Sequence, residues 1–419
     1  MTLACGLDFG TSNSTLGRIG PDGRPQLLAL EGGQQTMPSV LFFGFEDNQV
    51  HFGRAALAEY VTGAEGRLMR SLKSVLGTAL FADTTRVKAR RLGFGEIIGI
   101  FVGEMKRRAE TALGGELTRV VMGRPVQFVD DDAAADAEAQ AQLEAAVRAQ
   151  GFTDIAFQFE PIAAALDYER QVSGEKLALI VDLGGGTSDF SLVRVSPERA
   201  GKADRSADIL ATAGIHIGGT DFDRLLAMSR VMPELGLGSR TRDGKRHLPV
   251  APYFDLSTWH RINRLYDPQA LRDLRSTMRE AVEAERVKTF TMLVEDRLGH
   301  RLIGAVEAAK IALSDAPQVD FAFPVRDRTI RAGITLDQLG AALADSVARL
   351  EATIAETLRR AGIGAGDVDS LILTGGSTLV PAVSNGLSAM FPGAEIVRTD
   401  VLGSVGLGLA LEARRVFGA

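Results

Sequence analysis

The chain has 419 residues, with 47 Lys and Arg against 53 Asp and Glu, so its formal net charge is −6. This length suggests two or three domains, and a mildly acidic chain has no overall field that would attract nucleic acid or an anionic membrane. Hydrophobic residues make up 45% and charged residues 24%, which excludes a disordered chain and is typical of a globular protein.

Cysteine and glycine are the two informative counts. The single cysteine, Cys5, excludes internal disulfides and thiolate metal sites formed by this chain alone. Met1–Gly6 contains no basic region before an apolar run, and runs such as Ile97–Val102 are far shorter than the ~18 residues of a membrane helix. We therefore expect a cytoplasmic protein. Glycine accounts for 46 of 419 residues, about 11% against a usual ~7%, so its positions carry information.

In chain order, the first predicted element is a strand, a turn rich in Gly, Thr and Ser, and a second strand. Leu3–Phe9 and Thr15–Ile19 are these two strands. The same arrangement returns at Leu177–Leu183 and Phe190–Val195. The Asp residues that precede the two turns lie 174 positions apart, which is close to a domain length. This repeat predicts two related halves that open with the same hairpin.

The remaining segments alternate between strand-like and helix-like patterns, which predicts an α/β chain. The predicted strands are Val120–Met122, Ile155–Phe159, Ile209–Ala213 and Leu371–Thr374. The predicted helices are Ala133–Gln150, opened by Asp130-Asp131-Asp132, Asp337–Ala361, ended by Gly362, Val380–Met390 and Ser404–Val416.

Two stretches interrupt this alternation and are interpreted as insertions. Met228–Arg264 has no clear periodicity, and the stretch from Asp267 to Ser314 is almost entirely helical. A smaller insertion is predicted at Met37–Gly115. The predicted organisation is a first lobe at 1–172 with an insertion at about 37–115, a second lobe at 173–403 with an insertion at about 223–330, and a C-terminal helix at 404–419 that packs back on the first lobe.

The two Asp-Gly turns are candidates for anion binding. An Asp at the end of a strand lies at the sheet edge, and the glycines after it let backbone N–H groups approach an anion without a Cβ clash. A carboxylate beside such an anion is understandable when Mg²⁺ lies between the two. One copy alone would more often be a tight hairpin with a capping Asp. Two copies at domain spacing favour the binding interpretation.

Two further glycine pairs follow strand-like runs and precede helices. They are Gly218-Gly219 and Gly375-Gly376, the second followed by Ser377. Gly-Gly at a helix N-terminus can hold a sugar or a phosphate, although it is also a common turn. The sequence contains no P-loop, no dinucleotide glycine motif and no His-Glu-x-x-His, and its five scattered histidines predict no metal site.

Taken together, these motifs resemble the nucleotide-binding domain of the heat-shock protein 70 (DnaK-type) chaperones, in the actin–hexokinase–heat-shock ATPase superfamily. The matching segments, in order, are Asp8–Ser14, Phe159–Leu166, Asp182–Asp189 and Leu373–Pro381. In detail, and notably at Met232–Pro252, the likeness is closest to short bacterial YegD-like members. The resemblance implies a two-lobed actin-like ATPase fold of duplicated ribonuclease-H-like domains, with ATP or ADP and Mg²⁺ in the cleft.

The resemblance also implies catalytic and metal-binding roles. Asp8 and Asp182 would hold Mg²⁺ through its waters, and Asp189 would help to place the metal and the attacking water. The same likeness assigns Glu160 to the vicinity of that water. The positions implied to contact or adjoin the phosphates are Lys73 and Thr187. Without the resemblance, Lys73 would be interpreted as a solvated helix charge, and Glu160 as the residue before a helix-starting proline.

The implied nucleotide-contacting residues come from six parts of the chain. They are Gly10, Thr11, Ser12, Asn13, Gly184, Gly185, Gly186, Gly218, Gly219, Glu307, Lys310, Ser314, Gly375, Gly376, Ser377 and Asp400. The spacing of Glu307, Lys310 and Ser314 predicts one helical face. Without the resemblance, Glu307 and Lys310 would be an ordinary surface pair.

The sequence also departs from the family pattern. Leu379 stands where these chaperones usually carry an Arg against the adenine, and such a cation–π contact is worth roughly 0.5–2 kcal/mol. Ala156 and Phe159 stand where the family has an Arg and an Asn near the J-protein contact, so stimulation by a J-protein is not expected. The chain ends at Ala419, and we expect it to lack the peptide-binding domain.

The favoured function is a heat-shock protein 70-like ATP-binding protein with slow Mg²⁺-dependent hydrolysis. An unknown protein partner would respond to the nucleotide state, and neither nucleic acid nor membrane is expected as a partner. Two alternatives remain: a small-molecule (sugar) kinase of the same superfamily, and an actin-like nucleotide sensor or filament subunit.

Overall fold

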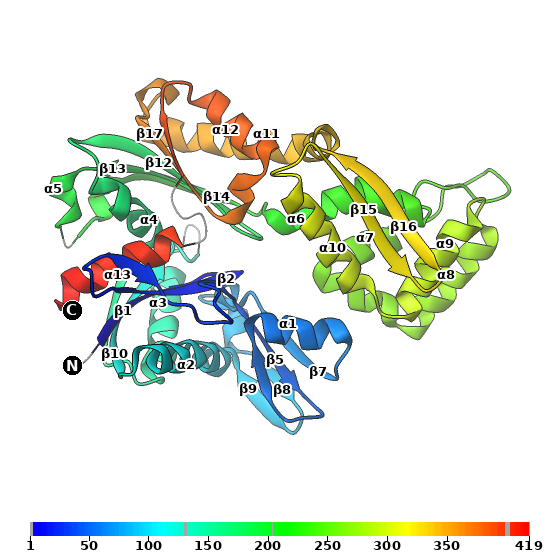
Figure 1. The fold of residues 1–419 in the computed structure, drawn as a ribbon, viewed down its shortest axis with the longest axis horizontal. Coiled ribbons are helices and arrows are strands. Elements are labelled where there is room, and N and C mark those ends of the chain that lie inside the picture. The colour runs from blue at the N-terminus through cyan, green and yellow to red at the C-terminus, as the bar shows by residue number, and fades with distance from the viewer. Residues whose placement is uncertain (1–2, 130–131, 203, 399–402, 419) are drawn as a thin grey trace.

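The computed structural model describes residues 3–129, 132–202, 204–398 and 403–418. Its centre is a pair of sheets, one drawn in blue and cyan and the other in green and orange (Figure 1). A helical region with one long hairpin extends to the right of the second sheet (Figure 1). None of the described helices is long and apolar enough to cross a membrane.

The first sheet has the strand order β11-β10-β1-β2-β3, and β4 pairs with β2. β1 is antiparallel to β2 and parallel to β10, which is parallel to β11. The strands are β1 (Leu3–Phe9), β2 (Asn13–Ile19), β3 (Pro25–Leu27), β4 (Met37–Pro38), β10 (Leu117–Arg124) and β11 (Asp154–Phe159). The strands predicted here are confirmed, although β2, β10 and β11 begin two, three and one residues earlier than expected and β10 ends two residues later.

The second sheet repeats this plan in the order β14-β13-β12-β17-β18. β12 is antiparallel to β13 and parallel to β17, which is parallel to β18. The strands are β12 (Lys176–Leu183), β13 (Ser188–Val195), β14 (Ile209–Ile215), β17 (Ser370–Thr374) and β18 (Glu395–Arg398). The repeat seen in the sequence is therefore a repeat of sheet topology, and the fold is the duplicated α/β fold that the sequence predicts.

The helices around the sheets begin and end where local chemistry dictates. The Asp132 side chain accepts hydrogen bonds from the amides of Ala134 and Ala135 at the start of α3 (Ala133–Arg148), whereas Asp130 and Asp131 lie outside the described residues. α11 (Leu336–Ala361) starts with a capping box and ends at Gly362, which has φ of +68°. The other helices here are α5 (Pro197–Ala200), α12 (Pro381–Met390) and the short η3 (Ser206–Asp208), η7 (Ala365–Asp367) and η8 (Gly376–Leu379).

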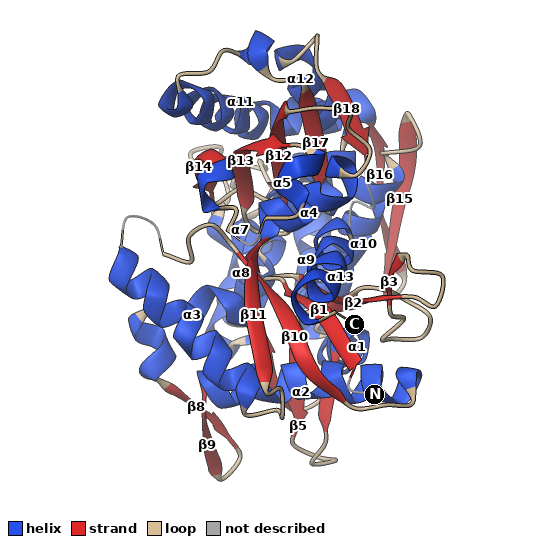
Figure 2. Ribbon diagram, turned by 90° about the vertical axis from the view of Figure 1, so that its left-hand side faces the viewer, coloured by secondary structure: helices blue, strands red, loops and turns tan. Residues whose placement is uncertain are grey.

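Two helices connect the halves. Each follows the strands of one sheet in the chain and packs on the other sheet. α4 (Glu160–Glu169) follows the first sheet but contacts β12, β13 and β17. α13 (Ser404–Phe417) follows the second sheet but packs on β1, β2 and β10, and it also crosses α4 (Figure 2). The crossing depends on a glycine, because a Cβ on Gly408 would lie 1.8 Å from the carbonyl oxygen of Ala163. This close contact joins the two halves.

The first sheet carries an insertion between β4 and β10. A small three-stranded sheet, a two-stranded ribbon and two helices form it. Its elements are β5 (Val40–Gly44), β6 (Val50–Phe52), α1 (Gly53–Thr62), β7 (Gly66–Arg70), η1 (Leu72–Val75), η2 (Ala79–Ala82), β8 (Thr84–Val87), β9 (Arg90–Gly93) and α2 (Phe94–Leu113).

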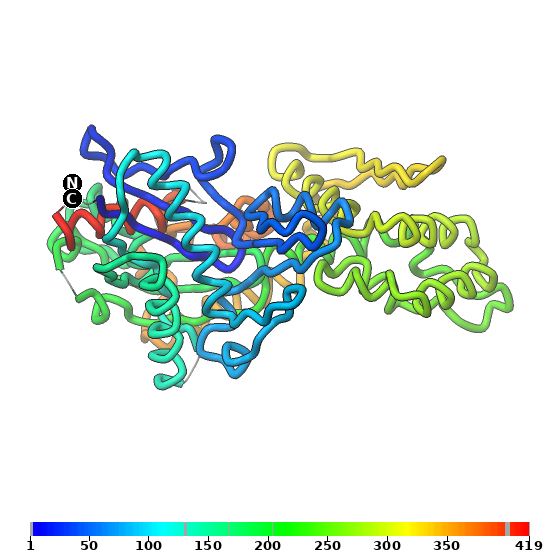
Figure 3. The backbone as a smooth tube through the Cα atoms, turned by 90° about the horizontal axis from the view of Figure 1, so that it is seen from below, coloured from blue at the N-terminus to red at the C-terminus, as the bar shows by residue number. Residues whose placement is uncertain are grey.

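The second sheet carries a larger insertion between β14 and α11, at the opposite end of the molecule from the start of β1 and the end of α13 (Figure 3). The stretch Met228–Arg264, which the sequence predicts to be irregular, contains a series of short helices. The helical character predicted from Asp267 to Ser314 is confirmed. The elements are α6 (Gly219–Leu226), η4 (Ala227–Val231), η5 (Met232–Leu235), α7 (Ala251–Ser257), η6 (Trp259–Tyr266), α8 (Pro268–Glu280), α9 (Ala284–Glu295), α10 (Gly299–Ala312), β15 (Gln318–Val325) and β16 (Arg328–Thr335).

The helix crossing generates a stability prediction. Gly408→Ala should lower the free energy of unfolding by about 2 kcal/mol or more, because overpacking at a site that cannot relax costs roughly 1–3 kcal/mol. Gly304→Ala is the matched control, since Gly304 also lies within a helix but nothing stands within 4 Å of its Cβ position. That control should be neutral or gain about 0.5–1 kcal/mol from helix propensity. Urea unfolding of the three proteins measures both effects, and equal stabilities would contradict the tight crossing.

Candidate functional site

The two Asp-Gly turns meet face to face between the sheets. A Cβ on Gly185, in the second turn, would lie 2.4 Å from the hydroxyl oxygen of Ser12, in the first turn. In the second turn, the amide of Gly184 donates to the carbonyl of Thr187 at 2.9 Å. In the first turn, the backbone comes so close to itself that a Cβ on Gly10 would lie 2.2 Å from the carbonyl oxygen of Asn13. Segments about 170 residues apart in sequence therefore form one glycine-lined surface.

The two glycine pairs predicted at helix starts pack around the second turn. The amides of Gly219 and Thr220 donate to the carbonyls of Gly184 and Gly185, at 3.0 and 2.8 Å. The Ser377 hydroxyl donates to the carbonyl of Gly184 at 3.1 Å. A side chain would block two further close approaches. A Cβ on Gly218 would lie 2.5 Å from the amide nitrogen of Gly186, and a Cβ on Gly375, which has φ of +80°, would lie 2.8 Å from Asp182 Oδ1. Gly376 begins η8.

Acidic side chains gather beside these turns. Asp8 precedes the first turn in β1, and Asp182 stands at the matching place in β12, directly across the ladder from Asp189 of β13. Glu160, the first residue of α4, lies opposite, and its Oε1 is 2.5 Å from Lys73 Nζ of η1. The side chains of this ion pair are only 10% and 16% exposed. The structure thus brings the predicted catalytic carboxylates and the lysine together.

The electrostatics of this cluster show an excess of negative charge. Burial, then Glu160 and Asp182, raise the pKa of Asp8 from 3.8 to about 8 despite the opposing effect of Lys73. Burial, Asp189 and Glu160 likewise raise the pKa of Asp182 to about 7. Burial alone would lower the pKa of Lys73, but Glu160 and Asp8 outweigh it and raise that pKa. One lysine does not neutralise these carboxylates, so the cluster favours a further cation.

The donor set fits a hydrated hard cation. Among the described residues, no group of three or more His, Cys, Asp or Glu side chains converges closely enough to hold a metal directly. Carboxylates placed further apart can hold Mg²⁺ through its waters, since that ion loses water reluctantly. The oxygen-only chemistry of Asp8 and Asp182 is consistent with this mode of binding.

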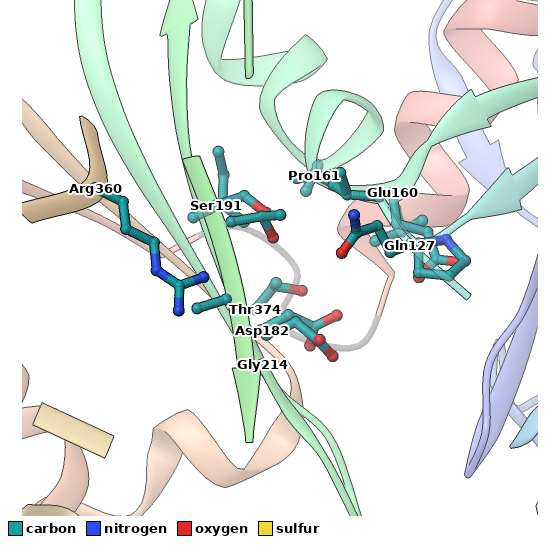
Figure 4. A pocket seen from close by; sticks show the side chains of 16 residues that line it. Gln127, Glu160, Pro161, Asp182, Ser191, Gly214, Arg360 and Thr374 are labelled. Carbon is teal, nitrogen blue, oxygen red and sulfur yellow. The ribbon is translucent and has the colours of Figure 1, made fainter. Parts of the chain in front are cut away.

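A pocket of about 210 Å³ opens on the carboxylates. Glu160 from α4 and Asp182 from β12 line it, together with Asp189, the loop 125–127 and β14 residues 212–214 (Figure 4). Arg360 of α11 lies across the strand from the acidic residues (Figure 4). The pocket gives space for water or an ion next to the acidic cluster.

Of the predicted group Glu307, Lys310 and Ser314, the first two lie on α10. Lys310 is buried, with its Nζ 2.7 Å from Asp223 Oδ1 and donating to the carbonyl of Gly219 at 3.2 Å, while Glu307 is exposed. Ser314 lies just beyond α10, which ends at Ala312, in the turn that follows. Asp400 lies outside the described residues.

Asp223 was not identified from the sequence as a residue of the site, although its spacing from Gly219 could have indicated it. It lies four residues after Gly219 on α6, so the geometry of a helix brings it back under the glycine pair. Nothing in the sequence indicated that Lys310 would be its partner. Leu379, the departure from the family pattern, is 46% exposed.

The two insertions touch each other through aromatic side chains, which sequence reasoning also missed. The ring centroids of Tyr60 (α1) and His300 (α10) are 4.7 Å apart, edge to face, and Asn263 donates to the Tyr60 hydroxyl at 2.6 Å. Arg70 of β7 stacks over Trp259 of η6, 5.4 Å from the ring centroid. Burial and the nearby Arg70 lower the pKa of His300 to about 4, so the ring is neutral in this contact. We call this contact between the insertions, formed by Tyr60, Arg70, Trp259, Asn263 and His300, the latch.

Comparison with known proteins gives one family. The family model described as Hsp70 protein matches residues 4–232 and 278–414. The chaperone protein DnaK of Thermosipho melanesiensis is 27% identical over 416 residues, covering 97% of this chain and 58% of that protein. DnaK of Thermotoga maritima is 28% identical over 410 residues, with the same coverage of 97% and 58%. The HscA homolog of Bordetella pertussis is 27% identical over 434 residues, covering 99% and 58%. The chain thus spans less than two thirds of these relatives.

The raised pKa values predict how the stability of the metal-free protein depends on pH. Asp8 and Asp182 have ordinary values of 3.8 but titrate near 8 and 7 in the fold, so between pH 4 and 8 the folded state holds more protons than the unfolded state. Stability must therefore fall as the pH rises through this range.

We expect the melting temperature in EDTA to fall from pH 5 to pH 8, and to fall less steeply in Asp182→Asn, which cannot ionise. Added Mg²⁺ should restore stability most at pH 8, where the carboxylates that hold it are charged. Thermal melts of both proteins at four pH values test this. Parallel pH profiles for the two proteins would contradict the assignment.

Proposed function

This chain belongs to the Hsp70 family, and from that premise we propose that it binds ATP or ADP with Mg²⁺ between its two sheets and hydrolyses ATP slowly. The observation that carries the proposal is the contact between the two Asp-Gly turns, beside a carboxylate cluster with one lysine. Phosphoryl transfer to water depends mainly on positioning and charge neutralisation, and these groups provide both.

The proposed roles follow from the positions of the side chains. Backbone amides of the turns at 10–13 and 184–186 hold the phosphates, while Asp8 and Asp182 hold Mg²⁺ through its waters. The ion supplies charge neutralisation when bound. Glu160 orients the attacking water, and Asp189 helps to place the water and the metal. These roles are supported by the burial and proximity of the carboxylates.

Lys73 has a double function in this proposal. Without nucleotide it pairs with Glu160 at 2.5 Å. A terminal phosphate brings more negative charge than one carboxylate, so it competes for the ammonium group and releases Glu160 for the water. Thr187, whose carbonyl closes the second turn, lies beside the same phosphate.

We further propose that the nucleotide state changes the relation of two lobes, at 1–172 and 173–403, with insertions at about 37–115 and 223–330. The helix at 404–419 belongs by its packing to the first lobe. A protein partner would recognise the resulting surface; J-protein stimulation is not part of the proposal, nor is binding to nucleic acid or membrane. Because the chain spans about 58% of its relatives, capture of a peptide client is not assigned to it.

Nucleotide binding can be tested directly by calorimetry. We expect Mg²⁺·ADP to bind the wild-type protein, and Asp8→Ala and Asp182→Ala to weaken binding at least tenfold, because each removes a carboxylate that holds the hydrated ion. EDTA should have a similar effect. Asp320→Asn, at an exposed position on β15, is the control and should bind normally.

No binding by the wild-type protein at millimolar nucleotide would refute the proposal. Two further outcomes would replace it by another function of the same superfamily. Strong stimulation of ADP formation by one member of a sugar panel would indicate a kinase. ATP-dependent light scattering would indicate a filament subunit.

The latch between the insertions predicts the rate of nucleotide release. Tyr60→Ala removes the ring that contacts His300, so the cleft should open more readily and a fluorescent ADP analogue should leave several times faster in stopped-flow measurements. Tyr60→Phe keeps the ring and loses only the hydrogen bond from Asn263, so it should lie close to wild type. Equal release rates for all three proteins would show that the latch does not limit opening.

A further inference from the structure

We propose that Asp223 is a positioning residue, which holds Lys310 against the backbone of Gly219 and thereby fixes the second glycine turn in its nucleotide-binding shape. This inference rests on the proposed function and deepens it. It also gives Lys310, which the family likeness placed beside the nucleotide, a role in holding the loop.

The contacts form a continuous chain from Asp223 to the turn. Asp223 Oδ1 lies 2.7 Å from Lys310 Nζ, and the same ammonium group donates to the carbonyl of Gly219 at 3.2 Å. The amide of Gly219 then donates to the carbonyl of Gly184 at 3.0 Å. Asp223 therefore reaches the second turn through one side chain and one peptide unit.

Burial makes this arrangement depend on both partners. The side chains of Lys310 and Asp223 are only 8% and 6% exposed, so neither charge is stabilised by bulk water. Removing one partner of a buried pair leaves the other uncompensated. The ammonium group has two oxygen partners within the protein, and through the second of them it acts on the loop at Gly219.

The loop itself has no room to adjust. A Cβ on Gly219 would lie 2.8 Å from the Ser377 hydroxyl oxygen and 3.6 Å from Lys310 Nζ. Ser377 of η8 and Lys310 of α10 thus both lie next to this glycine. If Lys310 loses its anchor, the peptide at 218–220 gains freedom, and so do the carbonyls of Gly184 and Gly185 that it binds.

The charges around Asp223 make the pair sensitive to pH. Burial raises the pKa of Asp223 from 3.8 to about 7; Lys310 opposes this, while Glu307 of α10 and Asp221 of α6 add to it. Asp221 is itself held by Arg224 at 3.0 Å and accepts from the amide of Gly218 at 3.1 Å. Protonation of Asp223 below neutral pH would therefore release Lys310.

The first test is amide hydrogen exchange of the nucleotide-free protein. In Asp223→Asn, exchange of the amides of Gly219 and Thr220 should rise at least tenfold, and Lys310→Met should give the same increase. The double variant should show no more than either single change, because both act through one contact. Additive effects, or unchanged exchange in both single variants, would overturn the proposal. Asp320→Asn is the matched control.

The second test is the affinity for Mg²⁺·ADP as a function of pH. The wild-type protein should bind more tightly than Asp223→Asn at pH 8, about tenfold, and the ratio should approach one at pH 6. The phosphates titrate equally in both experiments, so the ratio isolates Asp223. A ratio independent of pH would indicate a purely structural residue and overturn the positioning role.

The two tests separate this inference from the proposed function. If wild-type protein binds no nucleotide but exchange rises in the variants, the proposed function fails and the positioning of the turn stands. If nucleotide binds and exchange is unchanged, the positioning role fails alone. Should Asp223→Asn not fold, exchange of wild-type Gly219 and Thr220, corrected for intrinsic rates, must still increase between pH 8 and pH 6.

Discussion

The central constraint of this structure is the burial of several carboxylates around one lysine, at the place where two similar sheets meet. Asp8 and Asp182 occupy equivalent ends of equivalent strands, so duplication of the sheet also duplicates the charge. Burial and mutual repulsion keep their pKa values far above normal. Such an arrangement is unfavourable for the empty protein, and a bound cation would relieve it. The backbone amides of the glycine turns beside it would suit the accompanying anion.

The helix exchange between the halves determines how this cluster can change. α4 carries Glu160 at its start, while Glu169 at its end pairs with Arg205 at 2.6 Å, both almost completely buried against the second half. Glu160 thus begins a helix that contacts both sheets, whereas Lys73 belongs to the insertion of the first sheet. Their ion pair joins that insertion to the helix that contacts both sheets. A phosphate that takes Lys73 would act on the chemistry and on the relation of the halves at the same time.

Glycines allow the close backbone contacts between distant segments of the chain. Gly408 lets α13 touch α4, and Gly185, Gly218 and Gly375 let four separate segments approach one another in the site. A Cβ at any of these positions would meet another atom at 2.8 Å or less. The high glycine content is thus partly a consequence of backbone contacts between distant segments, both at the joint and at the phosphate turns.

The local elements and the repeat follow from the sequence alone. Alternating apolar residues and glycine turns specify β1–β2 and β12–β13, and Asp132 and Gly362 specify helix ends, because these signals act over a few residues. The family likeness also identified most residues that converge here. The tertiary structure was needed to show that Asp223 pairs with Lys310, that Tyr60 meets His300, and that α10 ends at Ala312, before Ser314. Such contacts join segments far apart in the chain or depend on where a helix ends, and neither burial nor partner choice across that distance is written in local periodicity.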